Sequence, residues 1–354
     1  MSTADPSQLG SWKSQPDSSL TSLIAGTAKD SRSLRRFQLL TLAMTLLMTG
    51  LVTAWLPGSS IEIPPENFKG LLPVFAFLVS LYLPAVAIAG ILRRRSSRLS
   101  HYLRNGADRV AIVLRVTMIF LLFASLPGLY TYLAASTKAP LLDPTLAAID
   151  RSLGFDWLTF LDWINAYPRV CQVLIFAYHA TIPLLPVMVI GLALANREGR
   201  AMELLALFSV SLLLTGLVMA MVPAAGAYAH FQPSRERFSN LTAQAGMWHY
   251  RDLLLLRSGA PFVFRPAEIS GIVTFPSFHT VIAVITAYSV RGLRFVFIPV
   301  ATLNLLMIVS TLPEGGHHLV DVLAGLFVAC VSIVIVRTLC GPAVTGNAAA
   351  EPSA

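Results

Sequence analysis

The sequence predicts an all-α polytopic membrane protein with about eight spanning helices. Of its 354 residues, 55% are hydrophobic and 12% are charged, a balance that excludes both a soluble domain and a disordered chain. Several uninterrupted apolar runs approach or exceed ~18 residues, the usual criterion for a spanning helix. The net charge is +8, but the basic residues fall in short clusters between the apolar runs. That pattern is typical of a membrane protein and not of a nucleic-acid binder.

The order of apolar and polar segments divides the chain into four parts. Residues 1–34 are rich in Ser, Asp and Gln, and we expect them to form a flexible cytoplasmic tail. N-terminal transmembrane helices occupy 35–135, a second membrane domain covers 136–340, and 341–354 form a small, polar, disordered tail. The expected spans are 37–55, 71–92, 110–134, 170–195, 202–222, 272–290, 295–312 and 318–338.

Two local features modify this arrangement. Pro127-Gly128 is expected to bend the third span. In 137–168, acidic residues alternate with Leu, Ile, Phe and Trp, which predicts one or two short amphipathic helices lying in the membrane interface. Trp157, Trp163 and Tyr167 would anchor them at headgroup level.

The arginine clusters predict the orientation of the chain. The short loops at 93–109, 196–200 and 291–294 all carry arginine, and positive loops stay on the cytoplasmic side. We therefore expect an integral protein of the cytoplasmic membrane with both termini inside. The loops at 56–70, 136–169, 224–270 and 313–317 would then be extracytoplasmic.

Four polar residues stand out in the apolar stretch from Thr274 to Asp321: Ser277, His279, His317 and Asp321. An Asp at the centre of a membrane helix costs on the order of 2.5 kcal/mol or more, so such residues need a function. Two apolar runs lie between the histidines, one outward and one returning, and this predicts that both histidines end at one face. The four-residue spacing from His317 to Asp321 stacks them on a helix, where a carboxylate can orient an imidazole. A phosphate-handling site at the membrane surface follows, with Ser277 and the amides after Pro276 as an anion site.

The motifs PSFH at 276–279 and GGHHLVD at 315–321 resemble the type 2 phosphatidic acid phosphatase superfamily. The words FPSFHT and GGHHLVDVLAG look closest to its inositolphosphotransferase branch, which includes inositol phosphorylceramide synthases. The resemblance is strongest over about 250–335 and extends more loosely to 140–335, through LLDPTLAAIDRSLGFDW and FAYHATIP. It implies that 136–340 is a catalytic helical bundle.

The resemblance also implies an activity and residue roles. The protein would be a lipid phosphatase or phosphotransferase acting on a lipid phosphate or phosphodiester, with an inositolphosphotransferase as the case that the closest branch implies. His317 would be the nucleophile that forms a phosphohistidine, Asp321 would orient it, and His279 would protonate the leaving group and then activate the acceptor. Ser277 would bind phosphoryl oxygens. The scheme needs no metal and no cofactor. Whether water or an alcohol is the acceptor does not follow from the sequence.

Two motifs depart from the superfamily pattern. Its third motif opens with Ser-Arg, but this chain has Ser310-Thr311. Its first motif, Lys-x6-Arg-Pro, has an approximate counterpart from Arg257 to Arg265-Pro266, which is one residue too long. Arg257 and Arg265 are the candidates for supplying the missing positive charge, and ordinary headgroup contacts are the alternative.

Other interpretations of the same residues stay open. His317 and Asp321 could form a structural helix cap, and His279 could be a packed core residue. Ser277 could serve only as a helix N-terminal hydroxyl. His318 could replace His317 as the nucleophile, or all three histidines and Asp321 could bind zinc. His179 either lines a cleft or bonds a backbone carbonyl.

A different functional class also fits the composition. A transporter or lipid-binding protein could use the histidines and Asp321 as a proton relay. Relay residues would line a path near the middle of the membrane, whereas a phosphoryl-transfer site needs them together near one surface. Cys171, Cys330 and Cys340 match no metal or redox spacing, so they indicate neither.

Overall fold

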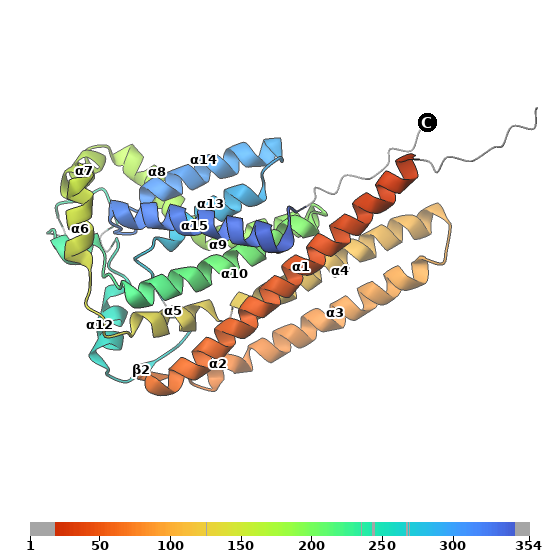
Figure 1. The fold of residues 1–354 in the computed structure, drawn as a ribbon, viewed down its shortest axis with the longest axis horizontal. Helices are drawn as coiled ribbons and strands as arrows, with labels where there is room; N and C mark the ends of the chain where they lie inside the picture. The colour runs from red at the N-terminus through yellow and green to blue at the C-terminus, as the bar shows by residue number, and fades with distance from the viewer. Residues whose placement is uncertain are drawn as a thin grey trace, which may run out of the picture.

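The protein is a bundle of helices that run along one long direction, with short helices across one end (Figure 1). The computed structural model describes residues 18–124, 126–234, 236–242, 245–266, 268 and 270–343. Strand is confined, in these residues, to β1 (Ile61–Glu62) and β2 (Phe262–Val263), which pair in parallel. The predicted all-α class is confirmed.

The helices divide into long membrane-type elements and short connecting ones. The long set is α1 (Ser18–Trp55), α3 (Leu71–Leu92), α4 (Arg98–Ala124), α5 (Pro127–Ala135), α8 (Pro168–His179), α9 (Thr181–Leu194), α10 (Glu198–Met221), α13 (Phe278–Ser289), α14 (Arg294–Ser310) and α15 (Leu319–Cys340). The short set is η2 (Leu56–Gly58), α2 (Glu66–Lys69), α6 (Asp143–Ser152), α7 (Trp157–Asn165), α11 (Ala227–Phe231) and α12 (Tyr250–Ser258).

Five helical segments of the described chain are long and apolar enough to cross a membrane, and the pair α8 and α9, bent by 58°, can be counted as a sixth. The protein is therefore an integral membrane protein. The remaining two expected spans are α13 and α14, which have 12 and 17 residues. α13 is short because residues 270–277 are not helical, so the expected span 272–290 begins as a helix only at Phe278.

The observed bounds differ from expectation in the N-terminal part. α1 begins at Ser18, so residues 18–34 of the expected tail are helical, and 1–17 and 344–354 lie outside the described residues. No proline interrupts 18–37, so nothing there forces the helix to end. Residues 98–109, expected in a loop, form the first turns of α4. The helix is interrupted before Pro127, close to the predicted bend.

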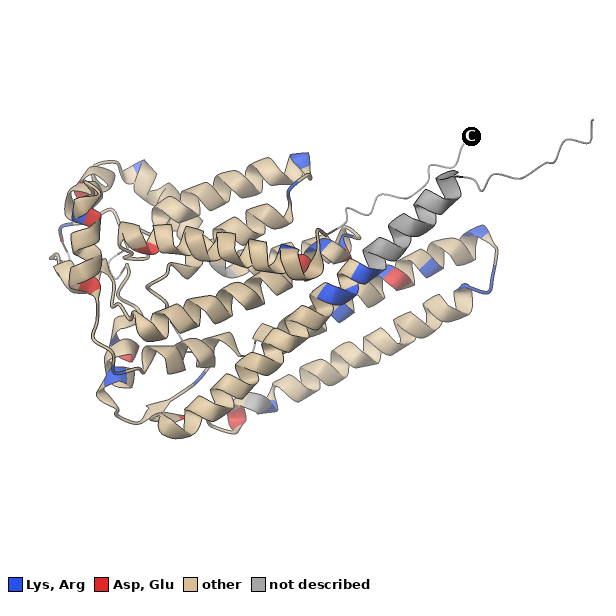
Figure 2. Cartoon of the chain, in the orientation of Figure 1, with Lys and Arg blue, Asp and Glu red and all other residues tan. Residues whose placement is uncertain are grey.

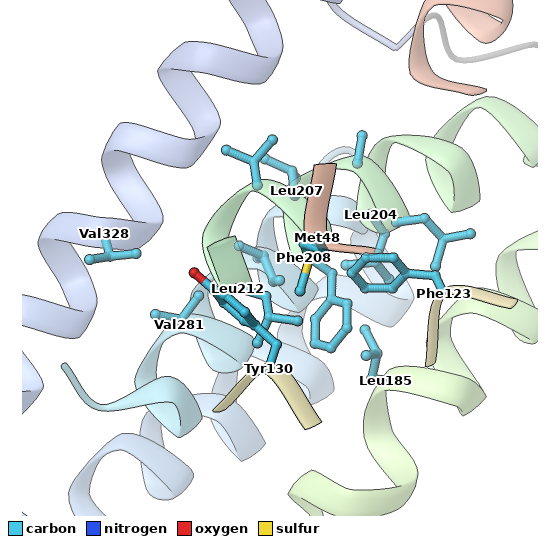
Figure 3. Packing of buried hydrophobic residues seen from close by; sticks show 14 of the residues in the cluster. Met48, Phe123, Tyr130, Leu185, Leu204, Leu207, Phe208, Leu212, Val281 and Val328 are labelled. Atoms are coloured by element: carbon cyan, nitrogen blue, oxygen red, sulfur yellow. The ribbon is translucent and has the colours of Figure 1, made fainter. Parts of the chain in front are cut away.

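α10 is the central helix, packed against α1, α5, α9, α13 and α15. Leu204, Leu207 and Phe208 point from it into the core shown in Figure 3. The Phe208 ring meets the Phe123 ring edge to face with 5.5 Å between centroids. Because α10 is surrounded, its apolar residues occupy all sides rather than one stripe.

The segment 137–168 forms two short helices, as predicted, but Trp157 is not an interfacial anchor. It is 1% exposed, stacked on Phe231 and in edge contact with Tyr228. Trp163 and Tyr167 are 58% and 51% exposed, as an anchor would be. The prediction for Trp157 was wrong because the loop 224–270 folds over α7, which the amphipathic pattern could not indicate.

Gly216 in α10 provides a test of this core. A Cβ there would lie 2.2 Å from Cε1 of Tyr130. The Tyr130 side chain is fully buried, and its hydroxyl donates a hydrogen bond to the Leu213 carbonyl at 3.0 Å. We expect Gly216→Ala to lower the free energy of unfolding by roughly 1–3 kcal/mol, because the ring cannot move away. A thermal melt of the detergent-purified protein measures this.

Gly191 in α9 is the matched control, since a Cβ there would meet nothing within 4 Å. Gly191→Ala should leave the melting temperature unchanged or raise it slightly through helix propensity. Equal effects of the two substitutions would contradict the packing described.

Candidate active site

The N-termini of α13 and α15 meet at one end of the bundle. The backbone N–H of Ser277 donates to the Asp321 carbonyl at 3.0 Å, which joins the two helix starts directly. Gly325 permits this approach, because a Cβ there would lie 2.5 Å from the Ser277 carbonyl oxygen. His279, in the first turn of α13, is thereby brought beside His317, which precedes α15.

His317, Asp321 and His279 form the centre of the site. Nδ1 of His317 lies 3.2 Å from Oδ2 of Asp321, and both side chains are almost fully buried. The His279 and His317 ring centroids are 6.3 Å apart. Tyr178 stacks on His279 with 4.5 Å between centroids and so limits its rotation. Nδ1 of His317 is thus occupied, and its Nε2 has no hydrogen-bond partner among the described residues.

The backbone of His317 is held on both sides. Its N–H donates to the Thr311 carbonyl at 3.1 Å, and its carbonyl accepts from Nε1 of Trp157 at 3.1 Å. Gly315 leaves room for the imidazole, since a Cβ there would lie 2.8 Å from Cδ2 of His317. Gly316 has a φ of +65°, which favours glycine, and its α-carbon packs against Gly246.

His318 points in a different direction, into a cage of two carboxylates. Its Nε2 lies 3.6 Å from Asp143 and its Nδ1 lies 3.6 Å from Asp150, and its ring is fully buried. Burial alone would lower the pKa of His318, but the two carboxylates outweigh it and raise the pKa to about 9. The ring is therefore an imidazolium at neutral pH, and neither nitrogen is exposed.

The same two carboxylates cap neighbouring backbone. Asp150 accepts from the N–H groups of Leu319 and Val320 at 2.8 and 2.9 Å, in the first turn of α15. Asp143 accepts from Ala225 and Gly226. Burial favours the protonated form of Asp143, but the contacts with His318 and these two amides outweigh it and lower its pKa.

His249 contacts the turn at Ala225 and the segment before α13. Its Nε2 lies 3.1 Å from the Ala225 carbonyl and 3.4 Å from Oγ1 of Thr274. Burial lowers the pKa of His249 to about 4, so the ring is neutral and its Nε2–H donates to the carbonyl.

The three predicted substrate-binding residues lie in different surroundings. Ser277 is fully buried and caps α13, because its Oγ accepts from the Thr280 amide and hydroxyl. Arg257 donates to the carbonyls of Thr137, at 2.6 Å, and Ala139. Arg265 is about half exposed and lies 3.8 Å from Glu268. In the described part of the chain neither arginine bonds to His279, His317 or Asp321, so their roles in substrate binding stay predictions.

Other candidates can also be located. His179 is exposed, and its ring lies 5.6 Å from that of Trp248, at the edge of the His279 environment. It has no hydrogen bond to a backbone carbonyl within the described residues, so it lines the surface of this region. Across the same residues, no group of three or more His, Cys, Asp or Glu side chains is arranged to hold a metal ion.

Sequence reasoning missed Asp143, Asp150, Trp157 and Tyr178. The acids were interpreted as the polar side of an interfacial helix. Their seven-residue spacing, which puts both on one face of α6, was the available signal for a shared partner. No local pattern indicated that Trp157 and Tyr178 contact the two histidines.

A family model described as the PAP2 superfamily matches residues 144–335, more than half of the chain. The chain belongs to the PAP2 superfamily. The match begins in α6 and ends in α15, so it includes every residue of the site except Asp143. Comparison with curated proteins and with solved structures found no match.

Membership confirms the superfamily predicted from the two motifs. PAP2 proteins are phosphatases and phosphotransferases, and this PAP2 protein is a membrane enzyme of that kind. The transporter alternative is not favoured. A proton relay would place its residues along the middle of a span, but His279 and His317 lie at helix starts.

The cage around His318 predicts a pH dependence of stability. The folded-state pKa of about 9 is above the ordinary value of 6.5, so the ion pairs stabilise the fold fully below about pH 6.5. This contribution is lost as the pH rises through about 9. The free energy of unfolding should fall there by at most about 1.4 kcal/mol per pH unit.

Thermal melts across this range check it, with His318→Gln as the comparison. The variant should be less stable at neutral pH and should lack this alkaline loss. The same slope in both proteins would show that His318 is not charged in the fold.

Proposed function

We propose that this PAP2 protein transfers the phosphoryl-containing group of a lipid phosphate or phosphodiester through a phosphohistidine on His317. The observation that carries the proposal is the buried pair of His317 and Asp321 with His279 beside it. One imidazole is oriented by a carboxylate, and a second faces it close enough to reach the same phosphorus. This is the arrangement of a nucleophile and a general acid.

In the first step Nε2 of His317 attacks phosphorus. A P–N bond forms, the P–O bond to the lipid alcohol breaks, and the alcohol oxygen takes a proton from His279. Asp321 holds the Nδ1 proton of His317 and stabilises the positive charge that the ring acquires. In the second step His279 removes a proton from the acceptor, whose oxygen attacks phosphorus and breaks the P–N bond.

The first turn of α13 supports binding of the phosphoryl oxygens. The N–H groups of Phe278 and His279 have no acceptor in the described chain, and the helix dipole favours an anion at this end. The corresponding amides of α15 are already bonded to Asp150. Ser277 contributes by capping α13, and direct contact of its hydroxyl with phosphate stays a prediction.

The choice of His317 over His318 follows from their surroundings. Both nitrogens of His318 face carboxylates at 3.6 Å, and a charged, enclosed imidazolium has no lone pair to offer. Nε2 of His317 has no partner among the described residues, and the ring centroids of His317 and His279 are 6.3 Å apart.

Replacing the two histidines should separate their roles. With a lipid phosphate, His317→Ala should abolish turnover, and His279→Ala should reduce it on the order of a hundred- to ten-thousandfold, the usual contribution of a general acid. With p-nitrophenyl phosphate, whose leaving group needs no proton, His279→Ala should still release one equivalent of p-nitrophenolate in a burst. His317→Ala should show no burst.

His101→Gln, which changes an exposed histidine in α4, is the control and should keep full activity. Matching melting temperatures would show that the variants are folded. Normal turnover by His317→Ala would rule out the mechanism.

The acceptor distinguishes a phosphatase from an inositolphosphotransferase, and we propose the latter on the resemblance of FPSFHT and GGHHLVDVLAG. Purified protein incubated with a lipid phosphate and inositol should then form inositol phosphate at the expense of free phosphate. Thin-layer chromatography with a phosphate assay measures both products. Phosphate release that is unchanged by inositol would assign the protein as a hydrolase.

We also propose that the site faces the extracytoplasmic side. The start of α1 and the end of α15 lie at the end of the bundle opposite the N-terminus of α15 (Figure 1). The arginine-bearing loops lie with them, so the positive-inside rule supports cytoplasmic termini. A C-terminal green fluorescent protein fusion should therefore fluoresce, and a dark fusion of full-length protein would reverse the orientation.

A further inference from the structure

A polar cavity lies at the end of the bundle away from the histidines, between α3, α4 and the turn that joins α9 to α10. Its volume is about 700 Å³. Figure 2 shows that Lys and Arg residues gather at this end of the bundle, whereas the short helices at the other end carry several acids. The polar residues that line the cavity are Arg93, Asn105, Asp108, Arg109, Arg115 and Asn196.

The charges in this cavity are not balanced. Arg93 lies 3.7 Å from Asp108, and Arg115 pairs with Glu198 at the start of α10. Arg109 has no ion-pair partner in the part of the chain that the structure describes. Nε of Arg115 is buried and has no acceptor among the same residues. Two of the three guanidinium groups are thus paired with acids, and Arg109 leaves one unpaired positive charge in the described lining, which favours an anion.

The other half of the cavity is apolar. Val86, Ala89 and Gly90 of α3 face Ile112 of α4, and the cavity extends along α3 from Arg93 to Tyr82. The two residues are eleven positions apart, about 16 Å along the helix, which reaches from the end of the span well into the hydrocarbon. A Cβ on Gly90 would meet nothing within 4 Å, so the space beside it is open.

We propose that this cavity binds an anionic phospholipid, with the phosphate at the three arginines and an acyl chain along Val86 and Ile112. The division into a basic end and an apolar end matches a lipid better than a free anion, which needs no apolar wall. Basic pockets between membrane helices are a known way of holding anionic headgroups. The site is separate from the histidines, so it does not depend on the function proposed for them.

Native mass spectrometry of the full-length protein in detergent tests the proposal, with phosphatidylglycerol as probe and phosphatidylcholine as the zwitterionic comparison. The wild type should bind phosphatidylglycerol more tightly. Arg109→Gln should weaken that binding about fivefold, the effect of losing one charge near a headgroup. Gly90→Leu, which fills the apolar half and keeps every charge, should weaken it as well.

Arg98→Gln is the matched control, because Arg98 lies on the same helix, is exposed and does not line the cavity. It should leave the affinity unchanged. Equal affinities of wild type, Arg109→Gln and Gly90→Leu would overturn the proposal. Inorganic phosphate is tested separately by its effect on the melting temperature. Stabilisation by phosphate, lost in Arg109→Gln and without any preference for phosphatidylglycerol, would overturn the lipid and leave a free-anion site.

Discussion

The candidate site depends on one buried imidazolium held between two carboxylates. His318 lies between Asp143 and Asp150, and the same acids bond the first amides of α15 and the turn at Ala225 and Gly226. Two segments that are distant in sequence, the start of α15 and the turn at Ala225 and Gly226, are thereby fixed to α6. A buried charge is tolerated only when it is paired, so the arrangement has little freedom to shift. His317 is the neighbouring residue, so fixing His318 also fixes the position of His317.

The two adjacent histidines therefore differ in how their ring nitrogens are paired with carboxylates. His318 has carboxylates on both nitrogens and is enclosed, whereas His317 has one carboxylate on Nδ1 and an unoccupied Nε2. The difference arises because His318 is the N-cap of α15 and His317 belongs to the preceding loop. Consecutive residues thus supply the structural ion cluster and the imidazole that we propose as the nucleophile.

The two ends of the bundle differ in charge and in what they can bind. At one end, short helices and the 224–270 loop enclose histidines, and the first turn of α13 offers amides to a phosphoryl group. At the other end, arginines from α3 and α4 surround a cavity with an apolar floor. In both proposals positive charge attracts phosphate, and only the first proposal includes a nucleophile.

The sequence by itself determined the fold class, the superfamily and the pairing of His317 with Asp321. These follow from hydrophobic periodicity, from a four-residue spacing and from short motifs, and each of these features lies within a contiguous stretch of sequence. It did not determine that α13 would be too short to cross a membrane, since hydropathy does not distinguish helix from the extended segment before it.

Only the tertiary structure decided which side chains surround the site. Trp157, Tyr178, Asp143 and Asp150 come from other helices, and their contacts with the two histidine motifs depend on how the loop 224–270 and α6 to α8 pack at the end of the bundle. The sequence pattern indicated a solvent-facing stripe for the two acids and an interfacial position for Trp157. Burial and partners are set by packing between distant segments, and that information is absent from any one stretch of the chain.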